Sequence, residues 1–476
     1  MSQVQAHDEQ SGEHEHSPVL RDGMHIHLVG IGGSGLSAIA WHLLGRGFTV
    51  SGSDLRRSDV VSALAQEGAR ITIGHAADNV SGAELVVISS AVPSDNEEVA
   101  AARAAGIPVL KRADLLGELM RGTAGIAVAG THGKTTTTSM IAHVLLESDR
   151  DPSVIVGGTP SQLEKNGRAG KGEHFVVEAD EYDYMFLGLH PRIAVVTNLE
   201  HDHPDLFPTA AEYHEAFHQF VGGIEEGGLL VACHDDAGAR QLLAGVTRAD
   251  VRQMTYGIDG DLSTVDYGAV DLRPNQLGGS DFVVTRNGDG LGVVRLRVPG
   301  EHNVRNALAA IAVCEAAGVS FANIMSALAS FGGVGRRFQV VGEINDVTVI
   351  DDYAHHPTEI RVTLAAARQR YPGRRLWAVW QPHTYSRTRL LKEAFAQCFD
   401  NADRVVVLDV YRSRETDTLG VSSQQIVLAM DHDGAVHIGE RANAAEHILQ
   451  RVRPGDVVLT LGAGDGNEVG VWIVEG

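Results

Sequence analysis

Short apolar runs alternate along the 476-residue chain with longer segments whose apolar residues recur at helical spacing. Residues 24–54 show the pattern first, as an apolar run, a glycine-rich turn, a helical segment and a second apolar run. Buried parallel strands are near-continuous apolar runs, and the helices that connect them carry apolar residues on one face. Repeated strand–helix units therefore predict an α/β fold with parallel sheets.

The alternation divides into three bodies, which predicts three domains. We expect a Rossmann-like domain at residues 23–121, a central domain at 122–334 and a second Rossmann-like domain at 335–476. The glycine-rich stretch "GGVGRR" marks the second boundary. Within the central domain, residues 260–299 change to strands of alternating polarity with turn glycines, which predicts a small antiparallel sheet.

The composition argues against several classes of protein. The formal net charge of −22 argues against nucleic acid as a partner, because a nucleic-acid binder would show a basic stripe. No apolar run approaches the roughly 18 residues that a membrane helix needs, so we expect no membrane insertion. The cysteines Cys233, Cys314 and Cys398 lie far apart, which fits a reducing compartment and predicts a cytoplasmic protein.

Residues 1–22 are rich in polar side chains and predict a disordered leader. His7, His14 and His16 could in principle bind a metal there. A solvated leader is the favoured interpretation, because nothing around these histidines can pack into a fixed site.

The stretch "GTHGKTTTT", Gly130 to Thr138, has the form of a phosphate-binding loop that is one residue too short. The consensus G-x-x-x-x-G-K-[ST] requires a glycine at the position of Val128. Lys134 and Thr135 nevertheless supply a cation for the phosphates and a hydroxyl for magnesium. An apolar strand precedes the loop and an amphipathic helix follows it. That context favours a nucleotide site over a glycine-rich turn with an incidental lysine.

Acidic and histidine side chains follow the next two predicted strands. Glu178 ends the apolar run of "FVVEAD" and is expected to reach magnesium beside the loop. Glu181 and Asp183 are interpreted as surface acids. His203, in "NLEHDHPD", stands near a strand end, where it could equally be a structural histidine or a metal ligand.

A second glycine loop follows the first strand. Gly30, Gly32 and Gly35 form G-x-G-x-x-G, and Asp54 follows at about the distance of the acidic residue in a dinucleotide fold. Many folds use such a loop for any pyrophosphate. Two phosphate-binding bodies in one chain suggest one nucleotide that reacts and another that serves as a handle.

Eight stretches of the chain resemble the Mur ligase family in order and spacing, and the resemblance covers everything after the leader. They are "HLVGIGGSGLSAIA", "SSAVPSDNEEV", "VEADEYD", "TNLEHDH", "PGEHNVRNALAA", "GVGRRFQ", "DDYAHHPTE" and "QPHTYSRT". The short form of the phosphate loop in "AGTHGKTTT" is that family's own. The chain most resembles the branch of the family that adds L-alanine.

The resemblance implies an N-terminal domain for uridine diphosphate, a central P-loop ATPase domain and a C-terminal domain that brings the amino acid. ATP would phosphorylate the carboxylate of UDP-N-acetylmuramate, and the amine of L-alanine would attack the acyl phosphate through a tetrahedral intermediate. The reaction belongs to peptidoglycan precursor synthesis. The reaction requires ATP and Mg²⁺. The protein could be a monomer or a homodimer, and the sequence does not distinguish the two.

The resemblance also assigns roles to individual residues. Those expected at ATP are Gly130, Thr131, His132, Gly133, Lys134, Thr135, Thr136, Asn303, Asn306, Arg337 and Asp352. Those expected at magnesium are Thr135, Glu178 and His203. Those expected at UDP-N-acetylmuramate or L-alanine are Gly32, Ser34, Gly35, Asp54, His75, Tyr353, His355, His383 and Arg387. Those expected in catalysis are Lys134, Glu178, His203, Arg337, His355 and Arg387.

The chain departs from the commonest family pattern at several positions. Tyr182 stands where a serine is usual, and Thr384 stands where many members carry an arginine. The second departure removes a guanidinium and leaves more of the substrate's charge to Arg387. His201 and Pro204 also stand where other residues are commoner.

Three competing interpretations remain. Tyr182 and "LEHDHPDLF" also resemble the sister ligase that joins a recycled tripeptide to UDP-N-acetylmuramate. A nucleotide-gated switch would bind ATP without forming a bond, and a dehydrogenase would use the first glycine loop for NAD. The cluster of Tyr353, His383 and Arg387 favours chemistry over a switch.

Overall fold

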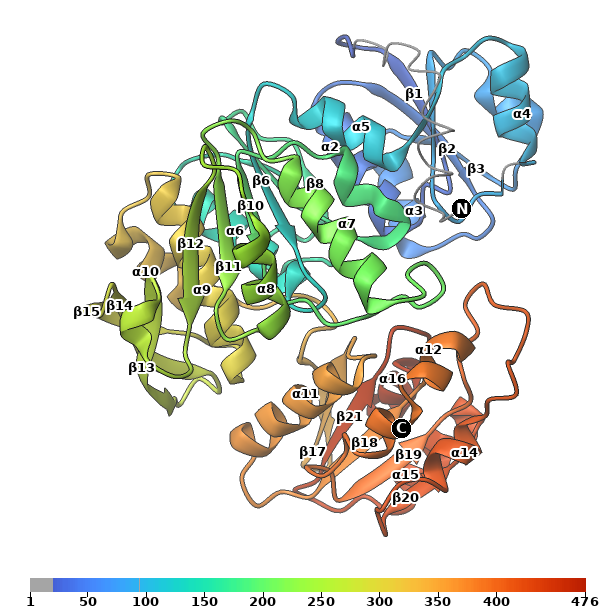
Figure 1. The fold of residues 1–476 in the computed structure, drawn as a ribbon. Helices are drawn as coiled ribbons and strands as arrows, with labels where there is room; N and C mark the ends of the chain where they lie inside the picture. The colour runs from blue at the N-terminus through green and yellow to red at the C-terminus, as the bar shows by residue number, and fades with distance from the viewer. Residues whose placement is uncertain (1–19, 94) are drawn as a thin grey trace.

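The computed structural model describes residues 20–93 and 95–476. Its strands form three sheets, and each of the three predicted domains contains one of them (Figure 1). The predicted three-domain α/β class is confirmed. Residues 1–19 of the predicted leader, with His7, His14 and His16, lie outside the described residues.

The N-terminal sheet has five strands in the order β3-β2-β1-β4-β5, all parallel. The order reverses at β1, and ligands of doubly wound sheets bind at such a point, beyond the carboxyl ends of the strands. The first glycine loop follows β1 directly and therefore lies at the switch point. The strands are β1 (His25–Val29), β2 (Thr49–Asp54), β3 (Arg70–Ile73), β4 (Leu85–Ile88) and β5 (Val109–Lys111), and the helices are α2 (Ser34–Gly45), α3 (Asp59–Gln66), α4 (Glu97–Ala104) and α5 (Arg112–Met120).

The central sheet has ten strands in the order β15-β14-β13-β12-β11-β10-β6-β9-β7-β8. Its first seven strands in chain order are β6 (Ala124–Ala129), β7 (Ser153–Ile155), β8 (Gly167–Arg168), β9 (His174–Glu178), β10 (Ile193–Val196), β11 (Leu229–Cys233) and β12 (Arg252–Gly257). The parallel strands β9, β6 and β10 are adjacent, so the segments that follow them meet at one edge of the sheet.

The predicted antiparallel region is present and continues the central sheet. It consists of β13 (Tyr267–Pro274), β14 (Ser280–Arg286) and β15 (Asp289–Arg295). β13 pairs with β12 in parallel, while β14 and β15 add antiparallel strands at the sheet end.

Helices cover both faces of the central sheet (Figure 1). They are α6 (Lys134–Glu147), α7 (Ala210–Gly222), α8 (Ala237–Gly245), α9 (Glu301–Ala316) and α10 (Phe321–Ser330). On one face, Met140 of α6, Leu308 of α9 and Leu328 of α10 belong to a single apolar cluster. The cluster on the other face contains Phe217 of α7 and also Leu36 of the N-terminal domain, so these two domains share a core.

The C-terminal sheet has six strands in the order β16-β17-β21-β18-β19-β20. Only β16 runs antiparallel to its neighbour. The strands are β16 (Gln339–Ile344), β17 (Val347–Asp352), β18 (Leu376–Trp380), β19 (Arg404–Val407), β20 (Ala435–His437) and β21 (Val457–Leu461). The helices are α11 (Pro357–Arg370), α12 (Tyr385–Leu390), α13 (Lys392–Ala396), α14 (Ser423–Val427), α15 (Arg441–Leu449) and α16 (Glu468–Glu475).

The C-terminal domain has apolar clusters of its own on both faces of its sheet. Across the described part of the chain, neither cluster includes a residue of the other two domains. Polar contacts instead join this domain to the central one, as between Arg387 and Asp202. Within the same described residues, no helix combines the length and apolar character that a membrane span requires.

Candidate active site

The predicted phosphate loop joins β6 to α6 and depends on two glycines. Gly130 and Gly133 have φ angles of +131° and +81°, in the region that favours glycine. A Cβ atom on Gly130 would lie 2.1 Å from Thr197 Oγ1, and one on Gly133 would lie 2.6 Å from Asn306 Oδ1. The tight turn brings the N-terminus of α6 to two neighbouring cavities, where its dipole favours anions.

Lys134 is held inside the loop by oxygen atoms. Its Nζ donates to Gly130 O at 2.5 Å and Thr131 O at 3.1 Å, and it lies 2.8 Å from Glu181 Oε2. Burial alone would lower the pKa of Lys134, but the charges of Glu181 and Asp180 outweigh burial and raise it. Lys134 is therefore a cation in a cavity that is ready to receive an anion.

Glu181 is not a surface acid, so that expectation is wrong. Its side chain is 1% exposed and lies between Lys134 and His203, whose Nε2 is 3.7 Å from Glu181 Oε1. Tyr213 also donates to the same carboxylate at 3.3 Å. The apolar strand pattern stops at Glu178, and no local signal shows that the chain folds back over the loop.

The two predicted oxygen ligands for magnesium lie side by side. Thr135 Oγ1 donates to Glu178 Oε1 at 2.9 Å, and Gly157 N donates to Glu178 Oε2 at 2.6 Å. Burial raises the pKa of Glu178. A hydroxyl and a carboxylate beside a phosphate loop are hard oxygen donors, which suit Mg²⁺. A divalent cation there would offset the burial cost of the Glu178 charge.

His203 lies on the same cavity but in a different environment. Its φ of +52° is uncommon for a non-glycine residue, and its ring packs edge-on against Tyr182 at 5.1 Å. The Nε2 atom lies 3.8 Å from Asp202 Oδ2 and faces Glu181 as well. The imidazole thus stands among acids at the cavity wall.

A cavity of about 330 Å³ lies between the central and C-terminal domains. The predicted ATP residues that line it are His132, Gly133, Thr135, Thr136, Asn303, Asn306, Arg337 and Asp352. Asn303 and Asn306 hydrogen-bond to each other at 3.2 Å. Asp352 accepts from the backbone N–H groups of Phe338 and Ala354, and burial raises its pKa to about 6.

A second cavity of about 550 Å³ is lined by residues of all three domains. The predicted site residues on its wall are Ser34, Gly35, Thr131, Gly133, Lys134, Thr135, Glu178, His203, Arg337, Tyr353, His355, His383 and Arg387. Gly133, Thr135 and Arg337 line both cavities. A triphosphate on the loop could therefore lie with its adenosine in the smaller cavity and its terminal phosphate in the larger one.

Arg387 makes a buried contact across the domain boundary. Its side chain is 4% exposed and donates to Asp202 through Nε at 2.8 Å and Nη2 at 3.1 Å. The third nitrogen, Nη1, lies 3.2 Å from His383 Nδ1. Asp202 holds most of this guanidinium, so the positive charge that Arg387 was expected to offer a substrate is largely neutralised in this arrangement.

His355 and His383 are neutral imidazoles on the C-terminal side of the larger cavity. Burial lowers the pKa of His355 to about 4 and that of His383 to about 2. Their ring centroids lie 6.0 Å apart. Tyr353 packs edge-on against His355 at 5.4 Å and stands beneath the Arg337 guanidinium at 5.1 Å.

The residues predicted at the uridine end divide into two groups. Ser34 and Gly35 line the larger cavity, and a Cβ atom on Gly35 would lie 1.9 Å from Arg112 Nη1. Asp54 instead accepts from Gly32 N at 2.9 Å and so holds the glycine loop. Neither Asp54 nor Gly32 is on the wall of that cavity.

His75 has a separate partner that no sequence pattern indicates. Its Nδ1 lies 3.2 Å from Glu98 Oε2 and 3.0 Å from Ser53 Oγ. Glu98 is fully buried, and although burial would raise its pKa, the His27 ring at 3.7 Å and a hydrogen bond from Ser53 help to lower it to about 2. His75 does not line either cavity.

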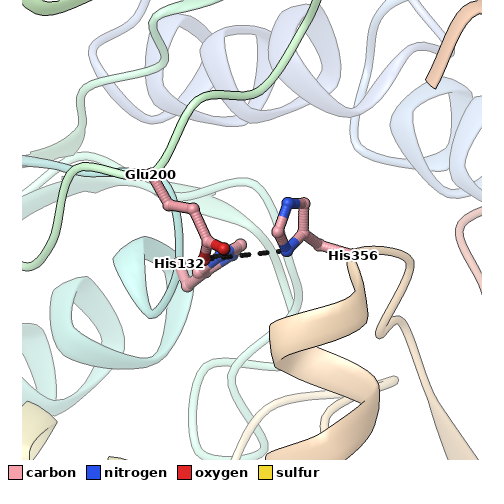
Figure 2. Close-up of side chains that lie close together, drawn as sticks. All are labelled: His132, Glu200 and His356. Carbon is pink, nitrogen blue, oxygen red and sulfur yellow. Dashed lines mark hydrogen bonds and ion pairs between the residues drawn. The ribbon is translucent and has the colours of Figure 1, made fainter. Parts of the chain in front are cut away.

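His132 connects the phosphate loop to the C-terminal domain. Its Nε2 lies 3.1 Å from Glu200 Oε2 and its Nδ1 lies 3.2 Å from Glu359 Oε1 on α11. Burial would lower the pKa of His132, but hydrogen bonds to the two carboxylates raise it to about 9. Figure 2 shows His356 beside His132 and Glu200: its Nδ1 lies 3.8 Å from Glu200 Oε2, and its ring centroid lies 4.8 Å from that of His132.

Sequence reasoning missed the acids that organise these cations. They are Asp180, Glu181, Glu200, Asp202 and Glu359. Glu200 and Asp202 lie in the quoted stretch "NLEHDHPD", whose position after a strand was the only local signal. Their partners come from sequence positions more than 60 residues away, so spacing along the chain could not identify them.

Three family descriptions match successive parts of the chain. The Mur ligase family catalytic domain matches residues 25–123, the Mur ligase middle domain 128–314 and the glutamate ligase domain of Mur ligases 336–464. Together with the three-domain fold and the cavities at their junction, these matches define the class. The chain belongs to the Mur ligase family.

Two curated relatives of the chain carry the same name. The UDP-N-acetylmuramate–L-alanine ligase of Pelotomaculum thermopropionicum is 45% identical, over 95% of this chain and 97% of the relative. The enzyme of the same name from Geobacter sulfurreducens is 46% identical, over 92% and 95%.

Two solved structures extend the comparison. The UDP-N-acetylmuramate–alanine ligase of Thermotoga maritima has a TM-score of 0.80 at 31% identity, with 95% of this chain and 98% of that chain covered. A murein peptide ligase of Psychrobacter arcticus covers the same shares, with a TM-score of 0.71 at 27% identity. The chain is thus similar to both branches that its sequence resembles.

Proposed function

We propose that the protein is an ATP-dependent ligase that joins L-alanine to the carboxylate of UDP-N-acetylmuramate in peptidoglycan precursor synthesis. The observation that carries this proposal is the pair of cavities that meet at Gly133, Thr135 and Arg337. Such a pair lets one nucleotide deliver its terminal phosphate to a substrate in the neighbouring cavity. The activity is that named for the curated relatives at 45% and 46% identity.

In the proposed reaction, a muramate carboxylate oxygen attacks the γ-phosphorus of ATP, and ADP leaves. The amine of L-alanine then attacks the carbonyl carbon of the acyl phosphate, and the carbon–oxygen bond to phosphate breaks after a tetrahedral intermediate. The amide forms, and inorganic phosphate carries away the former carboxylate oxygen. Phosphate replaces an oxide leaving group that an amine cannot displace.

The residues of the larger cavity divide this work. Lys134 and Arg337 stabilise the phosphoryl oxygens, because preorganised cations act strongly in a site that excludes water. Magnesium, for which Thr135 and Glu178 offer oxygen ligands and His203 a further donor, supplies charge neutralisation. His355, being neutral, can accept a hydrogen bond from the incoming ammonium group, whereas the Nδ1 atom of neutral His383 already accepts from Arg387.

The remaining roles follow the same arrangement. Gly130 shapes the loop, while the backbone of residues 131–133 and the hydroxyl of Thr136 lie at the phosphates. Asn303 and Asn306 face the adenine and Asp352 the ribose. Ser34, Gly35 and the Asp54-held glycine loop serve the uridine nucleotide, with His75 at its periphery. Tyr353 and Arg387 shape the amino-acid end.

We also place the reaction in the cytoplasm. Cys233, Cys314 and Cys398 are all buried free thiols, which persist in a reducing compartment. ATP is available there as the second substrate.

The test is the mass of the product from a reaction with UDP-N-acetylmuramate, ATP and two competing acceptors. L-Alanine and L-Ala-γ-D-Glu-meso-diaminopimelate would be offered at equal concentration. The proposal predicts the alanine adduct and release of ADP that requires both substrates. A tripeptide adduct would identify the recycling branch, and ATP turnover indifferent to both acceptors would indicate a switch.

A further inference from the structure

Five arginines line the larger cavity, although its expected ligands need cations at only a few points. They are Arg112, Arg336, Arg337, Arg387 and Arg414. An arginine held by a protein carboxylate must break that pair before it can anchor a substrate, whereas an unpaired guanidinium can bind one directly. The partners of these five side chains therefore show which of them is free to bind.

Three of the five are paired within the protein. Their guanidinium groups donate at hydrogen-bond distance to buried or half-buried carboxylates. These pairs are Arg112 with Asp180 at 3.0 Å, Arg336 with Asp351 at 2.9 Å and Arg387 with Asp202 at 2.8 Å. Arg337 lies at the border with the adenosine cavity, which suits the γ-phosphate.

Arg414 shares with Arg337 the lack of a close acid, since Arg337 Nη1 lies 3.9 Å from Glu359 Oε1, but only Arg414 stands away from the adenosine cavity. In the described parts of the chain its nearest carboxylate oxygen is Asp205 Oδ2, at 3.9 Å. The guanidinium carbon instead lies 4.1 Å above the ring of Tyr182, and the side chain is 49% exposed. The donors of Arg414 are thus left for a ligand of the cavity, while the aromatic ring fixes their position.

The segment that carries Arg414 is attached to the turn that begins α12. Thr384, in this turn, has a φ of +65° and donates its N–H to Tyr411 O at 2.8 Å. Glu415, next to Arg414, accepts from the backbone N–H groups of Tyr385 and Ser386 at the start of α12. Arg414 is therefore held beside Thr384, and Arg414 lines the cavity while Thr384 does not.

The location of Arg414 indicates which anion it meets. Tyr182, beneath the guanidinium, also contacts His203, which faces Glu181 and through it Lys134. Arg414 therefore lies beyond the phosphate end of the cavity and on the C-terminal domain. The α-carboxylate of an amino acid lies two bonds beyond the amine that attacks the acyl phosphate, so it extends away from the phosphates.

We propose that Arg414 binds the α-carboxylate of the incoming L-alanine. This inference rests on the proposed ligase function. The uridine nucleotide meets residues of the N-terminal domain, and the phosphates meet Lys134 and Arg337. Neither of these ligands requires Arg414.

The first test is steady-state kinetics of Arg414→Ala with each substrate varied in turn. The KM for L-alanine rises about 10- to 100-fold, the loss expected for a charge-assisted hydrogen bond, while the KM values for ATP and UDP-N-acetylmuramate stay within about twofold. Arg414→Lys recovers part of the loss. Arg412→Ala removes an exposed arginine of the same segment that lines neither cavity, and it leaves all three KM values unchanged.

The second test removes the other partner of the contact. Wild-type enzyme uses L-alaninamide, which lacks the carboxylate, with a kcat/KM at least about tenfold below that for L-alanine. In Arg414→Ala this discrimination falls to within about threefold. An unchanged KM for L-alanine, or a rise confined to ATP or UDP-N-acetylmuramate, would overturn the proposal. Alanine adduct formed by the wild type establishes the ligase independently of either result.

Discussion

At the scale of single residues, the cations of the site form buried ion pairs with acidic side chains. Lys134 pairs with Glu181, and Arg387 pairs with Asp202. A buried charge without a partner is costly, so each acid stabilises its cation until a substrate arrives. Because of this pairing, replacing one of these cations by alanine can lower both activity and stability, since the acid loses its partner.

Lys134→Ala is therefore expected to have two separable effects. It lowers ATP turnover by at least about 100-fold, because a cation at the phosphates is lost. It also lowers the free energy of unfolding by up to about 3 kcal/mol, because buried Glu181 loses its cation and keeps only Tyr213 and His203 as partners. Coupled ADP-release assays and urea denaturation measure the two effects.

The matched control is the double variant Lys134→Ala/Glu181→Gln. It recovers most of the stability, since the stranded charge is gone, but it stays inactive. Normal ATP turnover in this stable double variant would contradict the assignment of Lys134 to the phosphates.

At the scale of elements, the proposed phosphate loop depends on two tight turns that fit between β6, α6 and their neighbours. Gly133 combines a left-handed backbone with a close approach to Asn306 on α9. A side chain at Gly133 would suffer both backbone strain and a steric clash. Another glycine of the chain, Gly47, would suffer the backbone strain alone. Gly47 has a similar φ of +84°, but a Cβ atom added there would meet nothing within 4 Å.

The pair Gly133→Ala and Gly47→Ala separates backbone strain from steric conflict. Gly47→Ala lowers the free energy of unfolding by about 1–2 kcal/mol, the cost of a left-handed alanine, and leaves the KM for ATP unchanged. Gly133→Ala costs more and raises the KM for ATP, because Asn306 must move. Equal effects of both variants on ATP binding would show that the loop tolerates displacement.

At the scale of the whole molecule, the N-terminal and central domains share an apolar core, whereas polar contacts hold the C-terminal domain. Interfaces of that kind permit relative domain motion. Both cavities have walls from the C-terminal domain, so its movement would open them to substrates and its return would exclude water.

His132 makes that arrangement dependent on pH. Its folded-state pKa of about 9 exceeds the ordinary value of about 6.5, so its bond to Glu359 stabilises the protein fully below about pH 6.5. The stabilisation is lost as the pH rises through about 9. The difference in Tm between wild type and His132→Asn is expected to shrink from about pH 7 to about pH 10. A difference that stays constant would show that His132 is not protonated in the fold.

The three-domain α/β fold, the strand–helix order and the glycine turn between β6 and α6 could be predicted from the sequence, because these are local patterns. The proximity of Lys134, Thr135 and Glu178 on one cavity could also be predicted, since each follows a recognisable strand. The interpretation of Glu181 as a surface acid was wrong, because its burial depends on a fold-back over a distant loop. Arg414 was missed for the same reason, since the residues that position it come from two other segments.

The central claim is that ATP activates the carboxylate of the sugar nucleotide. The most direct measurement uses UDP-N-acetylmuramate with both carboxylate oxygens labelled with ¹⁸O, together with ATP and L-alanine, followed by mass analysis of the phosphate. We expect one ¹⁸O atom in each inorganic phosphate and one in the new amide. Unlabelled phosphate formed at the rate of ADP release would contradict the claim, because the terminal phosphate would then have gone to water.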